Sequence, residues 1–290
     1  MTTNAVDTNP APEATPTTPA YVGADPSLQL TLPRVIRSEW IKLRTLRGTW
    51  IFLGAVLFVL VALSAIAAAV STGSVATPDN QGPGFDTSDP LTTVLTGANF
   101  AVLLLGVFGA LAGAREFGSR MITATGAASP RRWQLLTGKA VVVAALALPV
   151  ALVGSFLAFA VGMSVLSAGG GATVGIGDSG VLGSLIGMGF YLTAIALLGL
   201  GLGVLLRSVA SSIGTLIAGV LILPGIAGAL LPDSWDPLLR LLPTNAAAAF
   251  TAVTSGSAEL LSSTAGVLVL AAWVVAALGA AAVTFARRDV

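Results

Sequence analysis

TWIFLGAVLFVLVALSAIAAAV, residues 49–70, is a run of apolar and small side chains without a formal charge. A helix rises 1.5 Å per residue, so about 20 such residues cross the ~30 Å hydrocarbon core of a bilayer. The run is too long for the apolar region of a cleaved signal peptide, which has about 7–15 residues. We therefore expect it to form an uncleaved transmembrane helix.

Further apolar runs follow along the chain, at residues 91–114, 140–163, 181–206, 212–231 and 264–286. Charged residues make up only 9% of the chain, against about 25% in an average soluble domain. None of the runs contains Asp, Glu, Lys or Arg, as expected where a charge at the membrane centre costs about 2.5–3.5 kcal/mol. The sequence predicts an all-α polytopic membrane protein, with six transmembrane helices in residues 49–290.

The basic residues fall on one side of these spans. They lie before the first span, between the second and third, after the fourth and after the last: Arg34, Arg37, Lys42, Arg44, Arg47, Arg115, Arg120, Arg131, Arg132, Lys139, Arg207, Arg287 and Arg288. The segments on the other side, 71–90, 164–180 and 232–263, contain only Arg240. By the positive-inside rule we expect both termini in the cytoplasm.

Two segments precede the first span. Residues 1–32 are rich in Thr, Pro and Ala, a composition that predicts a disordered cytoplasmic tail. Residues 33–48 predict an amphipathic helix on the inner membrane surface, because Ile36, Trp40 and Leu43 share helical spacing with basic residues around them. This helix is either a topological anchor on anionic lipid or an elbow that also contacts a soluble partner.

Two connections between spans also carry structural signals. Residues 115–139 form the longest cytoplasmic connection, where we expect a short surface helix that ends at the Ser129-Pro130 step; the alternative is a plain basic loop. Residues 232–263 are partly apolar but broken by Pro243 and Asn245, which favours an external re-entrant turn or short helix over an ordinary loop. Pro224 should kink the fifth span or start a short outer half-helix.

Glycines spaced four apart predict close helix packing rather than a functional site. The pairs are Gly109 and Gly113, Gly183 and Gly187, and Gly199 and Gly203.

The sequence excludes several mechanisms. It contains no Cys and no His, which removes thiol nucleophiles, disulfides and His-based proton transfer or metal ligation. Gly138-Lys139 is not part of a Walker A loop, because Trp133 stands where that loop needs its first glycine and Ala140 replaces its Ser or Thr. No span carries Asp, Glu, His, Lys or Arg for ion coupling, which leaves only sodium sites lined by backbone carbonyls open. A transporter of this composition needs an external source of energy.

Three stretches carry a family resemblance. SEWIKLRTLRGTW at residues 38–50, REFGSRMITATGAASPRRWQLLTGK at 115–139 and LLPTNAAAAF at 241–250 resemble segments of bacterial ABC-transporter permeases of the type-2 export class. With the six-span pattern, the resemblance covers nearly everything from Ser38 onward.

This resemblance implies a homodimer of six-span permeases in the bacterial cytoplasmic membrane, with separate ATPase subunits on the cytoplasmic face. The chain itself would bind no cofactor, because ATP and Mg²⁺ belong to the ATPase, and it would have no catalytic residue and no nucleic-acid partner. The implied cargo is hydrophobic or amphipathic and is exported. The coupling helix that contacts the ATPase would draw on residues of the 115–139 segment: Glu116, Phe117, Gly118, Arg120, Met121, Thr125, Pro130, Arg131 and Arg132. The N-terminal helix would flank that contact through Glu39, Trp40, Lys42 and Arg44.

Two other functions remain open on the sequence. An ATP-independent channel or transporter would move cargo without a partner subunit. A non-transport assembly or sensor subunit would move no cargo and would associate stably with another complex.

Overall fold

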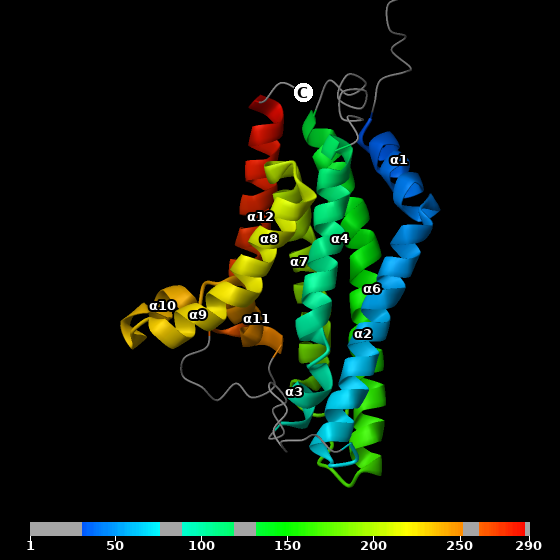
Figure 1. Cartoon of the computed structure of the whole chain (residues 1–290), viewed down its shortest axis with the longest axis vertical. Helices are drawn as coiled ribbons and strands as arrows, with labels where there is room; N and C mark the ends of the chain where they lie inside the picture. Colours follow the sequence, from blue (N-terminus) through cyan, green and yellow to red (C-terminus); the bar gives the residue numbers. More distant parts are fainter. Residues whose placement is uncertain (1–30, 76–88, 119–131, 252–260, 288–290) are drawn as a thin grey trace, which may run out of the picture.

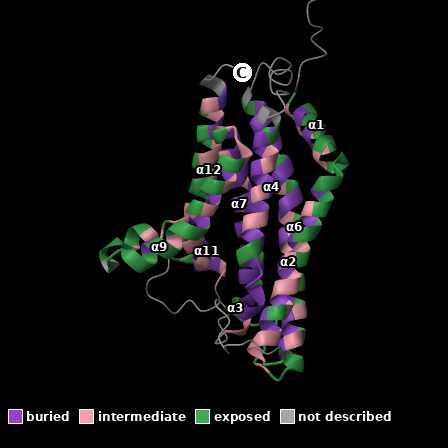
Figure 2. Cartoon of the chain, in the orientation of Figure 1, coloured by how far each residue is buried: buried purple, intermediate pink, exposed green. Residues whose placement is uncertain are grey.

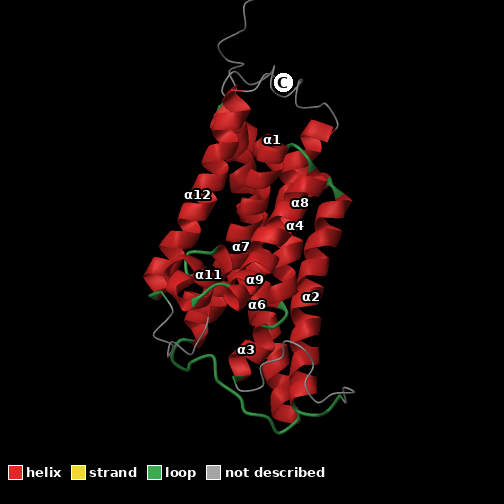
Figure 3. Ribbon diagram, turned by 60° about the vertical axis from the view of Figure 1, so that its left-hand side comes forward, coloured by secondary structure: helices red, strands yellow, loops and turns green. Residues whose placement is uncertain are grey.

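The computed structural model describes residues 31–75, 89–118, 132–251 and 261–287. These residues form long helices and no strand (Figures 1 and 3). Within them, six stretches are long and apolar enough to cross a membrane: α2 (Arg47–Ser71), α3 (Pro90–Leu95) with α4 (Ala98–Gly118), α6 (Arg132–Ala168), α7 (Val181–Leu206), α8 (Val209–Ile217) with η2 (Ala218–Ile222) and α9 (Leu223–Leu230), and α12 (Ser263–Arg287). The all-α fold with six spans is therefore confirmed.

Helices α4 and α7 form the centre of the bundle. Of the 18 most apolar consecutive residues in each of these two spans, 67% are buried. The corresponding share is 17% in α8–α9 and in α12. Figure 2 shows the buried residues concentrated along the central pair. Helices α2 and α6 pack beside them, and the Ser64 hydroxyl of α2 donates a hydrogen bond to the Ala158 carbonyl of α6 at 2.6 Å. A hydroxyl bonded in this way avoids the cost of an unpaired polar group in the apolar interior.

Glycines allow α4 and α7 to approach until their backbones touch. A Cβ at Gly113 would lie 2.5 Å from the Leu200 carbonyl oxygen, and one at Gly203 would lie 2.6 Å from the Ala110 oxygen. Both distances are too short for real Cβ contacts, so the predicted packing role is confirmed for these glycines. It is wrong for Gly183, where no atom of another described helix lies within 4 Å of the position that its Cβ would take.

The fifth span bends as Pro224 predicts. Helix α8 passes into the π-helical turn η2 and then into α9, which leaves the bundle at an angle (Figure 1). In a regular helix the N–H of residue 224 would donate to the Val220 carbonyl, but proline has no N–H. The Thr244 hydroxyl donates to that oxygen instead, at 2.7 Å. The Thr244 side chain, from another helix, thus supplies the hydrogen-bond donor that Pro224 lacks.

The described part of residues 232–263 contains short helices, α10 (Asp236–Leu239) and α11 (Pro243–Thr251), preceded by the 3-10 turn η3 (Asp233–Trp235). The Trp273 indole N–H of α12 donates to the Leu241 carbonyl at 2.7 Å, and the Asn245 amide donates to the Leu239 carbonyl at 2.8 Å. The first bond holds the segment against α12, and the second joins its two short helices. Residues 252–260 lie outside the described ranges.

Helix α6 begins earlier and ends later than the apolar run at 140–163 suggests. It extends over Arg132–Ala168, and 37 residues at 1.5 Å each give about 55 Å, well beyond a ~30 Å hydrocarbon core. Leu135 and Leu136 are buried among neighbouring helices, so packing continues the helix past its most apolar part. The first turns of α6 therefore occupy residues that the sequence assigned to the 115–139 connection.

Candidate functional site

One end of the bundle gathers most of the positive charge, and we call it the basic end. Figure 1 places α1 (Leu32–Thr45), the start of α2, the end of α4, the start of α6, the turn between α7 and α8 and the end of α12 at the top of the molecule. Described basic residues on these elements are Arg34, Arg37, Lys42, Arg44, Arg47, Arg115, Lys139 and Arg207. The segments that share a side in the sequence pattern thus share an end in the fold.

Helix α1 lies on this end through its apolar face. Val35 is 3% exposed and packs with Leu135 and Leu136 of α6, and the absence of a side chain at Gly138 leaves room for it. The chain then turns at Leu46, where the backbone is extended. The Trp50 indole N–H closes the turn by donating to the Arg44 carbonyl at 2.9 Å. The amphipathic helix predicted for residues 33–48 is present and ends at Thr45.

A buried carboxylate joins α1 to α6. Glu39 is 2% exposed, and its Oε1 accepts from Lys42 Nζ at 2.7 Å while its Oε2 accepts from Lys139 Nζ at 2.8 Å. The Lys42 side chain is 43% exposed and that of Lys139 only 9%. A charge removed from water is tolerated where it is paired and hydrogen-bonded. The Glu39–Lys139 pair therefore fixes the position of α1 on the first turns of α6.

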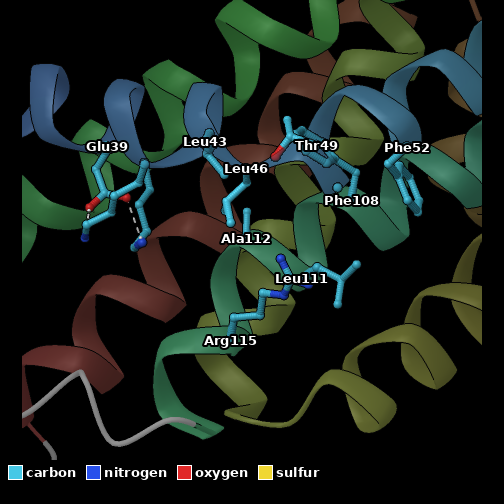
Figure 4. A pocket seen from close by; sticks show the side chains of 12 residues that line it. Glu39, Leu43, Leu46, Thr49, Phe52, Phe108, Leu111, Ala112 and Arg115 are labelled. Carbon is cyan, nitrogen blue, oxygen red and sulfur yellow. Dashed lines mark hydrogen bonds and ion pairs between the residues drawn. The ribbon is translucent and has the colours of Figure 1, made fainter.

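A pocket of about 200 Å³ opens beside this ion network, between α1, α2, α4 and α6 (Figure 4). Phe52 and Phe108 stack along one wall with ring centroids 6.1 Å apart. Its full lining is Glu39, Lys42, Leu43, Leu46, Gly48, Thr49, Phe52, Phe108, Leu111, Ala112, Arg115 and Lys139. The pocket is charged at one side and apolar at the other.

A second pocket of about 340 Å³ lies where the fifth span bends. Its lining is apolar apart from Thr215 and the indole N–H of Trp273: Leu198, Leu202, Thr215, Leu216, Gly219, Val220, Leu223, Leu242, Pro243, Trp273, Ala276 and Ala277. Such a space can accept apolar groups and offers little to fix a charged one.

The structure brings together part of the site that the sequence predicts. Glu39 of α1 meets Lys139 at the start of α6, and Lys42 bonds Glu39 from within α1. Trp40 packs against the core, and Arg44 is exposed. The backbone of Glu116, Phe117 and Gly118 ends α4, and that of Arg132 begins α6. Arg120, Met121, Thr125, Pro130 and Arg131 lie outside the described residues. The coupling role of all nine residues stays a prediction.

Sequence reasoning missed the partnership of Glu39 with Lys139. A signal was present, because Glu39 is the sole acidic residue between positions 26 and 78, and an isolated carboxylate in a basic helix needs a cationic partner once buried. Its second partner is 100 residues away and cannot be chosen from spacing. Within the part of the chain that the structure describes, no cluster of three or more acidic residues could hold a metal ion.

Part of the chain matches a known protein family. A family model described as ABC-2 family transporter protein matches residues 35–225, which is more than half of the chain. The matched range begins within α1 and ends in the bent fifth span. The search of curated proteins gives no match.

Proposed function

The chain belongs to the ABC-2 family of transporter proteins, and from this premise we propose that it is the permease subunit of an ABC exporter whose ATP is hydrolysed by a separate subunit. The observation that carries the proposal is the family match over residues 35–225, from α1 into the bent fifth span. Two copies of the chain would form the translocation pathway, and ATP and Mg²⁺ would bind to the ATPase.

The need for an external energy source supports the ATPase partner. The sequence has no Walker A loop, and its apolar runs carry no ionisable side chain that could relay a proton or pair with a coupling ion. ATP-driven movement of the partner would shift the permease between two arrangements, through contacts that differ between them.

The basic end supports a docking position for that partner. Its charge predicts that it faces the cytoplasm by the positive-inside rule, with both termini inside. The membrane we propose is the bacterial cytoplasmic membrane, as the family resemblance implies. The 115–139 connection leaves α4 and enters α6 at this end. Because Glu39 ties α1 to the start of α6, a push on the connection would reach α1 and α6 together. We assign the ATPase contact to Glu116–Arg132, flanked by α1.

The cargo class follows from the apolar pocket at the bend. Its lining of Leu, Val, Pro and Trp side chains suits hydrophobic or amphipathic molecules. The bend itself lies in a span that is only 17% buried within one copy, so this region is free to face a second copy across a shared pathway.

The test is partner retention. The chain is purified in mild detergent from its native host, and ATP hydrolysis by the eluted complex is measured. We expect Glu116→Ala with Phe117→Ala to lose the ATPase while the permease still inserts and elutes as a single species. A matched control is Asp236→Ala with Leu238→Ala, which also removes one carboxylate and one apolar side chain but lies on α10, away from the basic end (Figure 1).

Two results would count against the proposal. The first is that the permease purifies without an ATP-hydrolysing subunit under all conditions. The second is that deletion of the candidate ATPase leaves export intact. Retention of the ATPase by the Glu116 and Phe117 double variant would overturn only the assignment of the contact.

A further inference from the structure

The pocket beside the ion network has the two-sided chemistry of a lipid headgroup site. We infer that it binds the phosphate of an anionic phospholipid from the leaflet at the basic end, with the start of one acyl chain against the aromatic wall. This inference goes beyond the proposed function and does not depend on an ATPase partner.

The charge of the lining favours an anion. Among the described residues, the charged side chains that line the pocket are those of Lys42, Lys139 and Arg115 and the carboxylate of Glu39, so their formal charges sum to +2. Both carboxylate oxygens of Glu39 already accept hydrogen bonds from the two lysines. Figure 4 shows the Arg115 side chain extending from α4 into the space below α1. A phosphodiester would meet cations from three helices.

The rest of the lining favours a lipid over a free anion. Leu43, Leu46, Phe52, Phe108 and Leu111 form an apolar wall next to the cations. Inorganic phosphate gains nothing from such a wall, whereas each buried methylene of an acyl chain contributes about 0.8 kcal/mol. The change from charged to apolar lining occurs where α1 gives way to the apolar run of the first span, and the start of that run is where we place the lipid headgroups.

The size of the pocket argues against drug-sized cargo. About 200 Å³ is smaller than the roughly 300–1,000 Å³ of sites that enclose such molecules. It suits one phosphate and the glycerol beside it, while most of both acyl chains remain in the bilayer. Leu46 lines the pocket at the α1–α2 turn and is 44% exposed, so lipid can approach from the side.

The test uses native mass spectrometry of the purified full-length chain in detergent. Dioleoyl phosphatidylglycerol is titrated against dioleoyl phosphatidylcholine, which has the same acyl chains and no net charge. We expect preferential binding of the anionic lipid. In Lys42→Gln with Arg115→Gln that preference should fall at least about tenfold, since a direct hydrogen bond to a charged group contributes about 1.5–3 kcal/mol.

The matched control is Arg37→Gln with Arg44→Gln, which removes two exposed charges that do not line the pocket. It should change the preference by less than twofold, and size-exclusion elution of both double variants checks that they fold. An equal loss in both variants would mean diffuse surface attraction and would overturn the inference. The inference would also be overturned if millimolar inorganic phosphate competed fully with the lipid. It would likewise be overturned if the Lys42 and Arg115 double variant kept its lipid preference and instead lost a second permease copy or an ATPase.

Discussion

Replacing Lys139 by Met tests whether the buried ion pair holds α1 on the bundle. The side chain of Lys139 is 9% exposed and that of its counterpart Glu39 is 3% exposed. Removing one partner of a buried pair costs about 3–5 kcal/mol, because the remaining charge stays out of water. Since Glu39 keeps its bond to Lys42, we expect the lower end of that range. The matched change, Lys42→Met, removes the pair to the same carboxylate from a side chain that is 43% exposed, where about 0.2–0.5 kcal/mol is typical.

The assay uses the absence of cysteine from the natural sequence. Val35→Cys places a single thiol on the face of α1 that is 3% exposed, so a maleimide reacts only when α1 lifts off. A cost of about 3 kcal/mol corresponds to about a hundredfold rise in the labelling rate of the Lys139→Met variant. For Lys42→Met the expected rise is about twofold.

The double variant Glu39→Met with Lys139→Met completes the cycle. Apolar side chains of similar length in a buried position are commonly no worse than the ion pair they replace, so labelling should return close to the parent rate. The reasoning is refuted if the two lysine variants label at the same rate, or if the double variant is as open as Lys139→Met.

Further predictions concern the contacts inside the bundle. Gly109→Leu should separate α4 from α7, because a Cβ at this position collides with the Ala196 carbonyl. We expect the free energy of unfolding to fall by about 1–3 kcal/mol or more, measured by thermal denaturation in detergent. Gly183→Ala should cause no such loss, because space is open there. Thr244→Val should cost about 1 kcal/mol by leaving the Val220 carbonyl without its hydroxyl donor. That cost should shrink in a Pro224→Ala background, since alanine restores a backbone N–H; an unchanged cost would show that the hydroxyl does not compensate for proline.

Much of the fold could be predicted from the sequence because the bilayer imposes a simple rule. A helix that crosses hydrocarbon needs about 20 apolar residues without charge, and the runs in this sequence meet that rule one by one. Pro224 was equally readable, since a missing N–H has the same local effect in any helix. The prediction for Gly183 failed because the spacing of small residues shows only that a close approach is possible. Gly183 faces open space, whereas Gly109 meets a helix.

The candidate site was less predictable because it depends on contacts between distant segments. The periodicity of α1 revealed its apolar face. In the structure, Val35 on α1 is buried in a cluster with Leu135 and Leu136. Nothing in the spacing of Glu39 selects Lys139 over the other basic residues of the chain. The length of α6 was not readable from the apolar run, because Leu135 and Leu136 are held by tertiary packing outside that run. The residues of the 115–139 connection that would contact an ATPase fall largely outside the described ranges.

The long sequence separation of the Glu39–Lys139 pair has a consequence for biosynthesis. Glu39 leaves the ribosome 100 residues before Lys139, which at about 5–20 residues per second is an interval of about 5–20 s. During that interval Lys42, three residues along, is the partner already synthesised. Helix α1 is therefore translated early, but its ion pair with α6 can form only after two spans have been translated.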